Sequence, residues 1–354
     1  MHYCTKKGGT AYYDKGNYDE AIKSFENAIK IDSTDAWTYN NMGILYYDKG
    51  NYDEAMQSYE RAIKIDPNDA ETYYNMGAVY NNKRNYDEAI KCYESVIKID
   101  PNNAWAYINM GNAYSNKNND DEAIKCYESA IKIDPNNAEA YINMGNAYGN
   151  KNNYDEAIKC YESAIKIDPT NVGAYINMGA LYLGKGNCDE AMQLLEIAIK
   201  IDPNNAWAYI GMGNAYSNKN NDDEAIKCYE SAIKIDPNNA KAYSNMGNAY
   251  YYKGNYDEAI KSFKSVIKID PNNAEVYTLL GAVYRNKHNY DEAIKYYESA
   301  IKIDPNNALA YIGMGEAYNE KKDYKDAVKN FKIAAKLGNK KAIQRLKDNN
   351  ITWQ

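Results

Sequence analysis

Asparagine side chains recur in this sequence at positions that a peptide ligand could use. One set is spaced by 34 residues or a multiple of 34, and a second set follows three residues after that register. A carboxamide offers two donors and an acceptor, so it can hydrogen-bond a polypeptide backbone whatever side chains that polypeptide carries. We therefore predict a peptide-binding row of amides. The first set is Asn41, Asn75, Asn109, Asn143, Asn177 and Asn245, and the second is Asn112, Asn146, Asn214 and Asn248.

Three tryptophans form a second group of candidate binding residues. Trp37, Trp105 and Trp207 each stand four residues before a position of the first asparagine register. Large aromatic side chains are typical anchors of protein interfaces. They would equally serve to cover a junction between packed helices, and the sequence leaves both interpretations open.

The asparagine row has a compositional alternative, because asparagine is also abundant in the predicted loops. Helix interiors disfavour Asn relative to Ala by a fraction of a kcal/mol, which favours a functional role. Residues 104–137 and 206–239 are identical except that Asn109 becomes Gly211. Either the glycine makes space for a ligand at this point of the row, or the asparagines of the row have no function that requires them.

Catalytic chemistry finds little support. The two histidines, His2 and His288, lie in different parts of the chain, so the sequence indicates neither a metal cluster nor a Ser/His or Cys/His pair. No phosphate-binding glycine loop is present. Paired acids such as Asp155 and Glu156 recur throughout and suit helix starts. We predict a non-enzymatic protein without a cofactor or a bound metal.

The composition of the chain argues against two classes of partner, nucleic acid and membranes. A formal net charge of −7 and a pI near 5.2 argue against nucleic acid, whose binding needs clustered Lys and Arg. No apolar run approaches the length of a membrane span.

Four of the six cysteines occupy one repeated helical position, and they are Cys92, Cys126, Cys160 and Cys228. Cysteines at this position in successive repeats lie too far apart to form disulfides. We therefore expect free thiols and a cytoplasmic location.

Prolines reveal the organisation that must position these side chains. All eight prolines are spaced by 34 residues, from Pro67 to Pro305. A fixed period of this size indicates a solenoid of supersecondary units, each of which buries its apolar face against its neighbours.

Each unit reads as a helical hairpin. In the copy at residues 135–168, Tyr141, Met144 and Tyr148 mark one helical stripe, here called helix A. Gly50, Gly186 and Gly254 stand at equivalent ends of helix A, where a left-handed residue is favoured. A second helix, helix B, follows, and Asn153 with Glu156 predicts a capping box at its start.

The spacing Tyr141-x2-Met144-Gly145-x2-Tyr148, then Ala157-x3-Tyr161, then Pro169, resembles the tetratricopeptide repeat. This resemblance implies an all-α, right-handed superhelix of about ten hairpins whose A helices line a concave groove. The asparagine row is similar to the asparagine ladder in the repeat array of O-linked N-acetylglucosamine transferase, which implies binding of extended polypeptide. The carboxylate clamp of co-chaperones does not map, because Thr10 and Glu71 follow Lys6 where Asn and Lys are required.

We expect three regions. Residues 1–35 form a degenerate first repeat, residues 36–341 form nine repeats, and residues 340–354 form a capping helix and tail. The nine repeats start at residues 36, 70, 104, 138, 172, 206, 240, 274 and 308.

The predicted function is a non-catalytic scaffold that binds an extended peptide or a partner protein in the A-helix groove. One alternative is a structural array that self-associates through its N-terminal end. Another is the substrate-recruiting portion of a larger enzyme, against which the capping helix argues.

Overall fold

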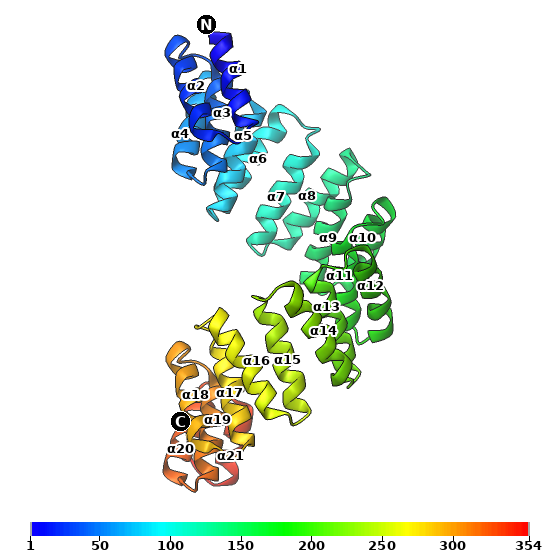
Figure 1. Ribbon diagram of the computed structural model, residues 1–354, viewed down its shortest axis with the longest axis vertical. Coiled ribbons are helices and arrows are strands. Elements are labelled where there is room, and N and C mark those ends of the chain that lie inside the picture. The colour runs from blue at the N-terminus through cyan, green and yellow to red at the C-terminus, as the bar shows by residue number, and fades with distance from the viewer. Residues whose placement is uncertain (1, 353–354) are drawn as a thin grey trace. The chain divides into compact units, whose positions relative to one another are not determined.

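A computed structural model describes residues 2–352, with side chains from Lys7 onward (Figure 1). The predicted clamp position Lys6 therefore lies outside the described side chains. Across the described residues the chain forms 21 helices and no strand, so the predicted all-α solenoid is confirmed. The chain divides into two compact units, Met1–Ala174 and Tyr175–Gln354.

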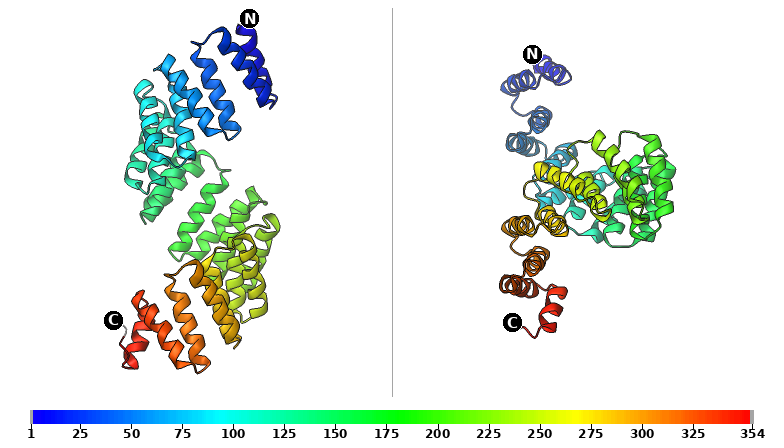
Figure 2. Two further views of the ribbon diagram at one scale, coloured as in Figure 1. Left: turned by 90° about the vertical axis from the view of Figure 1, so that its left-hand side faces the viewer. Right: turned by 60° about the horizontal axis from the view of Figure 1, so that its bottom comes forward.

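Odd-numbered helices up to α19 are A helices and even-numbered ones are B helices. In the first unit the A helices are α1 (His2–Tyr13), α3 (Ala36–Asp48), α5 (Ala70–Asn82), α7 (Ala104–Asn116) and α9 (Ala138–Asn150), and the B helices are α2 (Tyr18–Ile31), α4 (Tyr52–Ile65), α6 (Tyr86–Ile99), α8 (Asp120–Ile133) and α10 (Tyr154–Ile167). Helix α11 (Val172–Gly184) contains the division between the units. The second unit continues with A helices α13 (Ala206–Asn218), α15 (Ala240–Tyr252), α17 (Ala274–Asn286) and α19 (Ala308–Glu320), B helices α12 (Cys188–Ile201), α14 (Asp222–Ile235), α16 (Tyr256–Ile269), α18 (Tyr290–Ile303) and α20 (Tyr324–Lys336), and the final helix α21 (Lys340–Asp348). Figure 2 shows the hairpins within each unit stacked in chain order.

A glycine and an aromatic ring hold most of the hairpins together. Gly111 of α7 faces the ring of Tyr127 of α8 so closely that a Cβ on Gly111 would lie 2.6 Å from it. The Tyr127 side chain is therefore almost completely buried. In the first repeat Gly9 faces Phe25 in the same way. The Gly8-Gly9 pair thus includes the small residue that this packing requires, and α1 forms despite it.

The turn from A to B uses a left-handed residue, as predicted. Gly50 has φ +77° and Gly254 has φ +78°, while Asn152 has φ +60° at the equivalent place. The next amide, of Asn153, donates to the carbonyl of Tyr148 at 2.9 Å, which closes the end of helix A in a Schellman arrangement. The predicted capping box is wrong at Asn153, whose side chain makes no cap hydrogen bond. The side-chain cap does form at the start of some other B helices, so its presence varies along the stack.

Successive hairpins share one core. Tyr127 and Ala130 of α8 pack with Ile108 of α7 and with Ala140 of α9, so a B helix contacts the A helices on both sides. On the outer surface an ion pair between repeats recurs, such as Lys83 with Asp53 at 2.6 Å. The Asp53 side chain is 80% exposed, and such a pair contributes about 0–1 kcal/mol.

Two further predictions concern cysteines and the end of the stack. Cys92, Cys126, Cys160 and Cys228 are free thiols, as expected. Helix α21 packs against α20 through the buried side chains of Ala342 and Leu346. The division into a degenerate first repeat, nine repeats and a capping helix stays a prediction.

Candidate functional site

The predicted amides occupy two equivalent positions of the A helices. Members of the first set are the sixth residue of their helix, and members of the second set are the ninth. We call them the sixth-position and ninth-position asparagines, and the surface that they form within each unit the A-helix face. All are half-buried, so each keeps part of its side chain accessible.

Sixth-position asparagines link neighbouring repeats. The Nδ2 of Asn143 donates to Oδ1 of Asn112 in the preceding A helix at 3.1 Å. Asn245 donates in the same way to Asn214 at 2.8 Å. Because these bonds cross from one hairpin to the next, the amides help to fix the stacking as well as lining the A-helix face.

The other sixth-position asparagines have different partners. Asn41 donates to the backbone oxygen of Trp37 at 2.8 Å. Asn109 donates to the backbone oxygen of Trp105 at 3.1 Å and to the hydroxyl of Tyr74 at 2.7 Å. Asn75 donates to Oδ1 of Asn40 at 3.1 Å, and Asn177 is likewise engaged.

Ninth-position asparagines accept from buried tyrosines of helix B. The hydroxyl of Tyr127 donates to Oδ1 of Asn112 at 2.7 Å, and that of Tyr229 donates to Asn214 at 2.8 Å. Tyr161 donates to Asn146 at 2.6 Å. Burial raises the pKa of Tyr127 above its ordinary value, so its hydroxyl keeps the proton that it donates. Sequence reasoning missed this role, although the regular 15-residue spacing between the two residue types could have indicated it.

The pattern leaves defined polar atoms unused. Oδ1 of Asn112 receives two donors, and its Nδ2 has no partner among the described residues. Asn143 uses Nδ2 and leaves its Oδ1 without a partner in that same part of the chain. The orientation of each amide follows from this network. At this pair the face therefore offers an acceptor on Asn143 and a donor on Asn112.

Asn248 differs from the other ninth-position residues. The B-helix residue that would donate to it is Phe263, which has no hydroxyl and is fully buried. The next A helix carries Leu279 in place of a sixth-position asparagine. No hydrogen bond to the Asn248 side chain occurs within residues 7–352, and its polar atoms are not sealed from solvent.

Gly211 interrupts the row for a packing reason. A Cβ at Gly211 would lie 2.7 Å from the side chain of Leu195, which replaces the usual aromatic residue of helix B. Gly211 therefore makes room for a branched neighbour. Neither sequence-based explanation of this glycine, an opened groove or an unconstrained row, included that contact.

The three tryptophans have different surroundings. Trp37 of α3 packs edge-on against Phe25 of α2 with ring centroids 6.0 Å apart, so it covers the junction with the preceding hairpin. Trp105 is 50% exposed and borders a hollow of about 580 Å³ together with Tyr74 and Glu71. Trp207 is 58% exposed.

Residues 7–352 contain no group of three His, Cys, Asp or Glu side chains arranged to hold a metal ion. None of the helices described combines the length and the apolar composition that crossing a bilayer requires.

The hairpin stack defines a helical-repeat scaffold, and sequence comparison identifies its family. The pattern of the TPR repeat matches residues 9–50, 44–83, 116–152, 181–220, 213–254 and 247–288. Two tetratricopeptide repeat patterns match residues 70–103, 138–171 and 274–307, and residues 92–125, 160–193 and 296–329. The chain belongs to the tetratricopeptide repeat family, whose members act as protein-interaction scaffolds and are generally non-catalytic. A comparison with curated sequences gives no match.

Solved structures share the fold. A tetratricopeptide repeat protein from Parabacteroides merdae is 18% identical, with 70% of this chain and 98% of that chain covered and a TM-score of 0.58. The Cut9–Hcn1 hetero-tetramer of the APC/C is 17% identical over 87% of this chain and 74% of that chain, with a TM-score of 0.57. The human IFIT1 dimer with PPP-AAAA is 18% identical over 93% and 89%, with a TM-score of 0.54. At these identities the likeness concerns the fold alone.

Proposed function

We propose that this scaffold binds an extended polypeptide segment along the A-helix face. One observation carries the proposal: neighbouring asparagines leave one acceptor and one donor without a protein partner, namely Oδ1 of Asn143 and Nδ2 of Asn112. A polypeptide backbone presents one N–H donor and one carbonyl acceptor per residue. An acceptor beside a donor on the protein can engage both without reading side chains.

The spacing of the stack suits an extended ligand. Packed helices lie about 8–10 Å apart, and an extended chain advances about 3.3 Å per residue. One repeat therefore corresponds to roughly three ligand residues. Because a polyproline II chain completes one turn in three residues, amides that repeat once per hairpin would meet the same backbone group at each step of a ligand in that conformation.

The amides are also held in place before a ligand arrives. Asn112 is fixed by the Tyr127 hydroxyl and by Asn143, so little side-chain entropy is lost on binding. The hollow beside Trp105 and Tyr74 gives an apolar side chain of the ligand a place to bury. Trp105 and Trp207 are the tryptophans that we assign to binding.

Asn248→Ala provides the sharpest test, because Asn248 makes no described protein hydrogen bond. A peptide selected from a displayed library on the wild-type chain is titrated against the variant by calorimetry. We expect a Kd at least about threefold weaker with an unchanged melting temperature. Asn238→Ala, in an exposed turn of the same unit, is the control. Unchanged affinity for Asn248→Ala, for every selected peptide, would refute the proposal.

Self-association through the N-terminal end is the second candidate. The exposed rings of Tyr12 and Tyr13, 40% and 36% accessible, lie at the end of α1 and favour it. Light scattering over a range of concentrations separates the two candidates, since a peptide-binding monomer keeps one mass. A cytoplasmic location is a further proposal, supported by the free thiols.

A further inference from the structure

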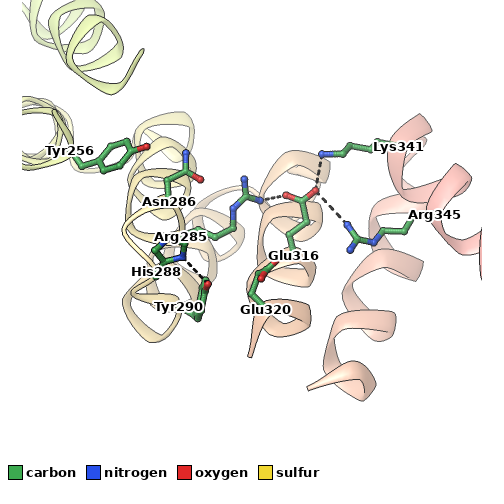
Figure 3. Close-up of a pocket in the computed structure, with 9 residues that line it drawn as sticks. All are labelled: Tyr256, Arg285, Asn286, His288, Tyr290, Glu316, Glu320, Lys341 and Arg345. Carbon is green, nitrogen blue, oxygen red and sulfur yellow. Dashed lines mark hydrogen bonds and ion pairs between the residues drawn. The ribbon is translucent and has the colours of Figure 1, made fainter. Parts of the chain in front are cut away.

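The rarest charged side chains of the chain meet at one place in the second unit. Two of the four arginines and one of the two histidines line a hollow of about 440 Å³ (Figure 3). Helices α17, α19 and α21 contribute most of its walls. The lining residues are Tyr256, Arg285, Asn286, His288, Tyr290, Glu316, Glu320, Lys341 and Arg345.

Three cations converge on one carboxylate there. Glu316 is paired with Arg285 of α17, with Lys341 at 2.7 Å and with Arg345 at 3.8 Å (Figure 3). The Glu316 side chain is only 15% exposed, whereas Lys341 is 72% exposed. Arg345 also lies over the ring of Phe331, with its guanidinium carbon 4.7 Å from the ring centroid, which fixes its position.

Positive charge exceeds negative charge at this site. Three cationic side chains face Glu316 and the exposed Glu320. The surrounding residues 308–354 contain ten Lys and Arg against five Asp and Glu, although the whole chain has a net charge of −7. An acidic protein with a basic end attracts acidic ligands to that end.

The site continues the A-helix face. Glu316 is the ninth residue of α19, the position that holds Asn214 and Asn248 in α13 and α15. Arg285 is the twelfth residue of α17, on the same side of its helix as the ninth. A ligand that follows the ninth-position residues would therefore reach these cations.

We propose that this hollow binds a side-chain carboxylate of an acidic peptide, with Lys341 and Arg345 as the ligating cations. The inference rests on the proposed function in that the ligand is a peptide on the A-helix face. Without a ligand, Glu316 forms ion pairs with all three cations. Because one carboxylate does not neutralise three positive charges, the cations can also bind a carboxylate of the ligand. A purely structural cluster that only anchors α21 would show no preference for acidic peptides.

The test uses two fluorescein-labelled peptides of about ten residues, built of alanine and serine. One carries three aspartates, and the other carries asparagines in their place. We expect the full chain to bind the aspartate peptide at least about threefold more tightly by anisotropy at low salt, where charges are screened least. Lys341→Gln should remove that preference. Lys340→Gln, on the same helix but outside the hollow, should keep it.

Glu316→Gln gives a change in the opposite direction. Removing the internal carboxylate frees the three cations, so affinity for the aspartate peptide should rise while thermal stability falls. An equal affinity for both peptides in the wild-type chain, or a preference that survives Lys341→Gln, would overturn this inference. Neither result bears on the backbone binding tested with Asn248→Ala, so the two proposals can fail separately.

Discussion

The Nδ2 of Asn143 in α9 donates to Oδ1 of Asn112 in α7 across 3.1 Å, and the hydroxyl of Tyr127 donates to the same oxygen across 2.7 Å. One carboxamide oxygen thus joins both helices of one hairpin to the A helix of the next. The residues nominated for ligand binding are therefore also residues that set the spacing of the stack.

Tyr127→Phe should show the structural part of this network. The change removes one donor to Asn112 and leaves the ring packing against Gly111 intact. We expect a loss of about 0.5–1.5 kcal/mol in the free energy of unfolding, measured by urea denaturation. Tyr93→Phe is a comparison, because its repeat has Ala78 at the ninth position and its hydroxyl makes no hydrogen bond within residues 7–352. A loss of equal size in both variants would mean that the Asn112 bond contributes nothing.

Gly111→Ala tests the packing within a hairpin. A Cβ would approach the Tyr127 ring to 2.6 Å, and overpacking of this kind costs about 1–3 kcal/mol. At Gly184 a Cβ would meet nothing within 4 Å. Gly184→Ala should leave thermal stability unchanged or raise it, because alanine favours a helix. Similar melting temperatures for the two variants would contradict the hairpin contact.

The three tryptophans should separate into two kinds. Trp37→Ala removes the contact with Phe25 and should lower the melting temperature. Trp105→Ala removes the wall of an open hollow and should weaken peptide binding by about 1 kcal/mol or more, with little loss of stability. Calorimetric titration and thermal unfolding of both variants check this. If Trp105→Ala binds like wild type, the hollow is not an anchor pocket.

The buried thiols should be unreactive in the native chain. Burial raises the pKa of Cys92, Cys126 and Cys160 to about 12. At pH 8 almost no thiolate is present, so reaction with a disulfide reagent should be at least about a hundredfold slower than after unfolding in urea. Cys188 and Cys228 are only half-buried. Among the thiols that the structure describes, these two should react first, and mass spectrometry of labelled peptides identifies the modified thiols.

The same shift predicts a pH dependence of stability. A thiol whose folded-state pKa is raised contributes stability that is complete below its unfolded pKa, about 8.5. Above that pH the unfolded chain releases the proton while the folded chain retains it, so the free energy of unfolding should fall as pH rises toward 12. Replacing Cys92, Cys126 and Cys160 by Ala should flatten this slope in urea titrations at pH 8 and pH 10. An unchanged slope would contradict burial of these thiols.

Periodicity in the sequence predicted the hairpin fold well, because 34-residue copies repeat the same apolar stripes. The left-handed turns followed from Gly50 and Gly254. The capping box at Asn153 failed, whereas the Asn119 side chain, with the same spacing to Glu122, does accept from the Glu122 amide. The short motif therefore does not decide whether the side-chain bond forms. The sequence placed the asparagines on one helix face but could not show which amide atom each uses, because that depends on Tyr127 and Tyr229 from another helix.

The ionic site was also beyond sequence reasoning. Arg285, Glu316 and Lys341 come from three helices and belong to no repeated pattern, so only the folded arrangement brings them together. Gly211 gives a similar lesson, because its small size reflects Leu195 of the preceding helix.

Site-specific photo-crosslinking tests the central claim most directly. A benzophenone amino acid replaces Asn248 on the A-helix face in one variant and the exposed Glu162 of helix B in another, and each is irradiated with a library-selected peptide. Binding along the A-helix face predicts a cross-link at position 248 and none at position 162. A cross-link at position 162 with none at position 248 would contradict it.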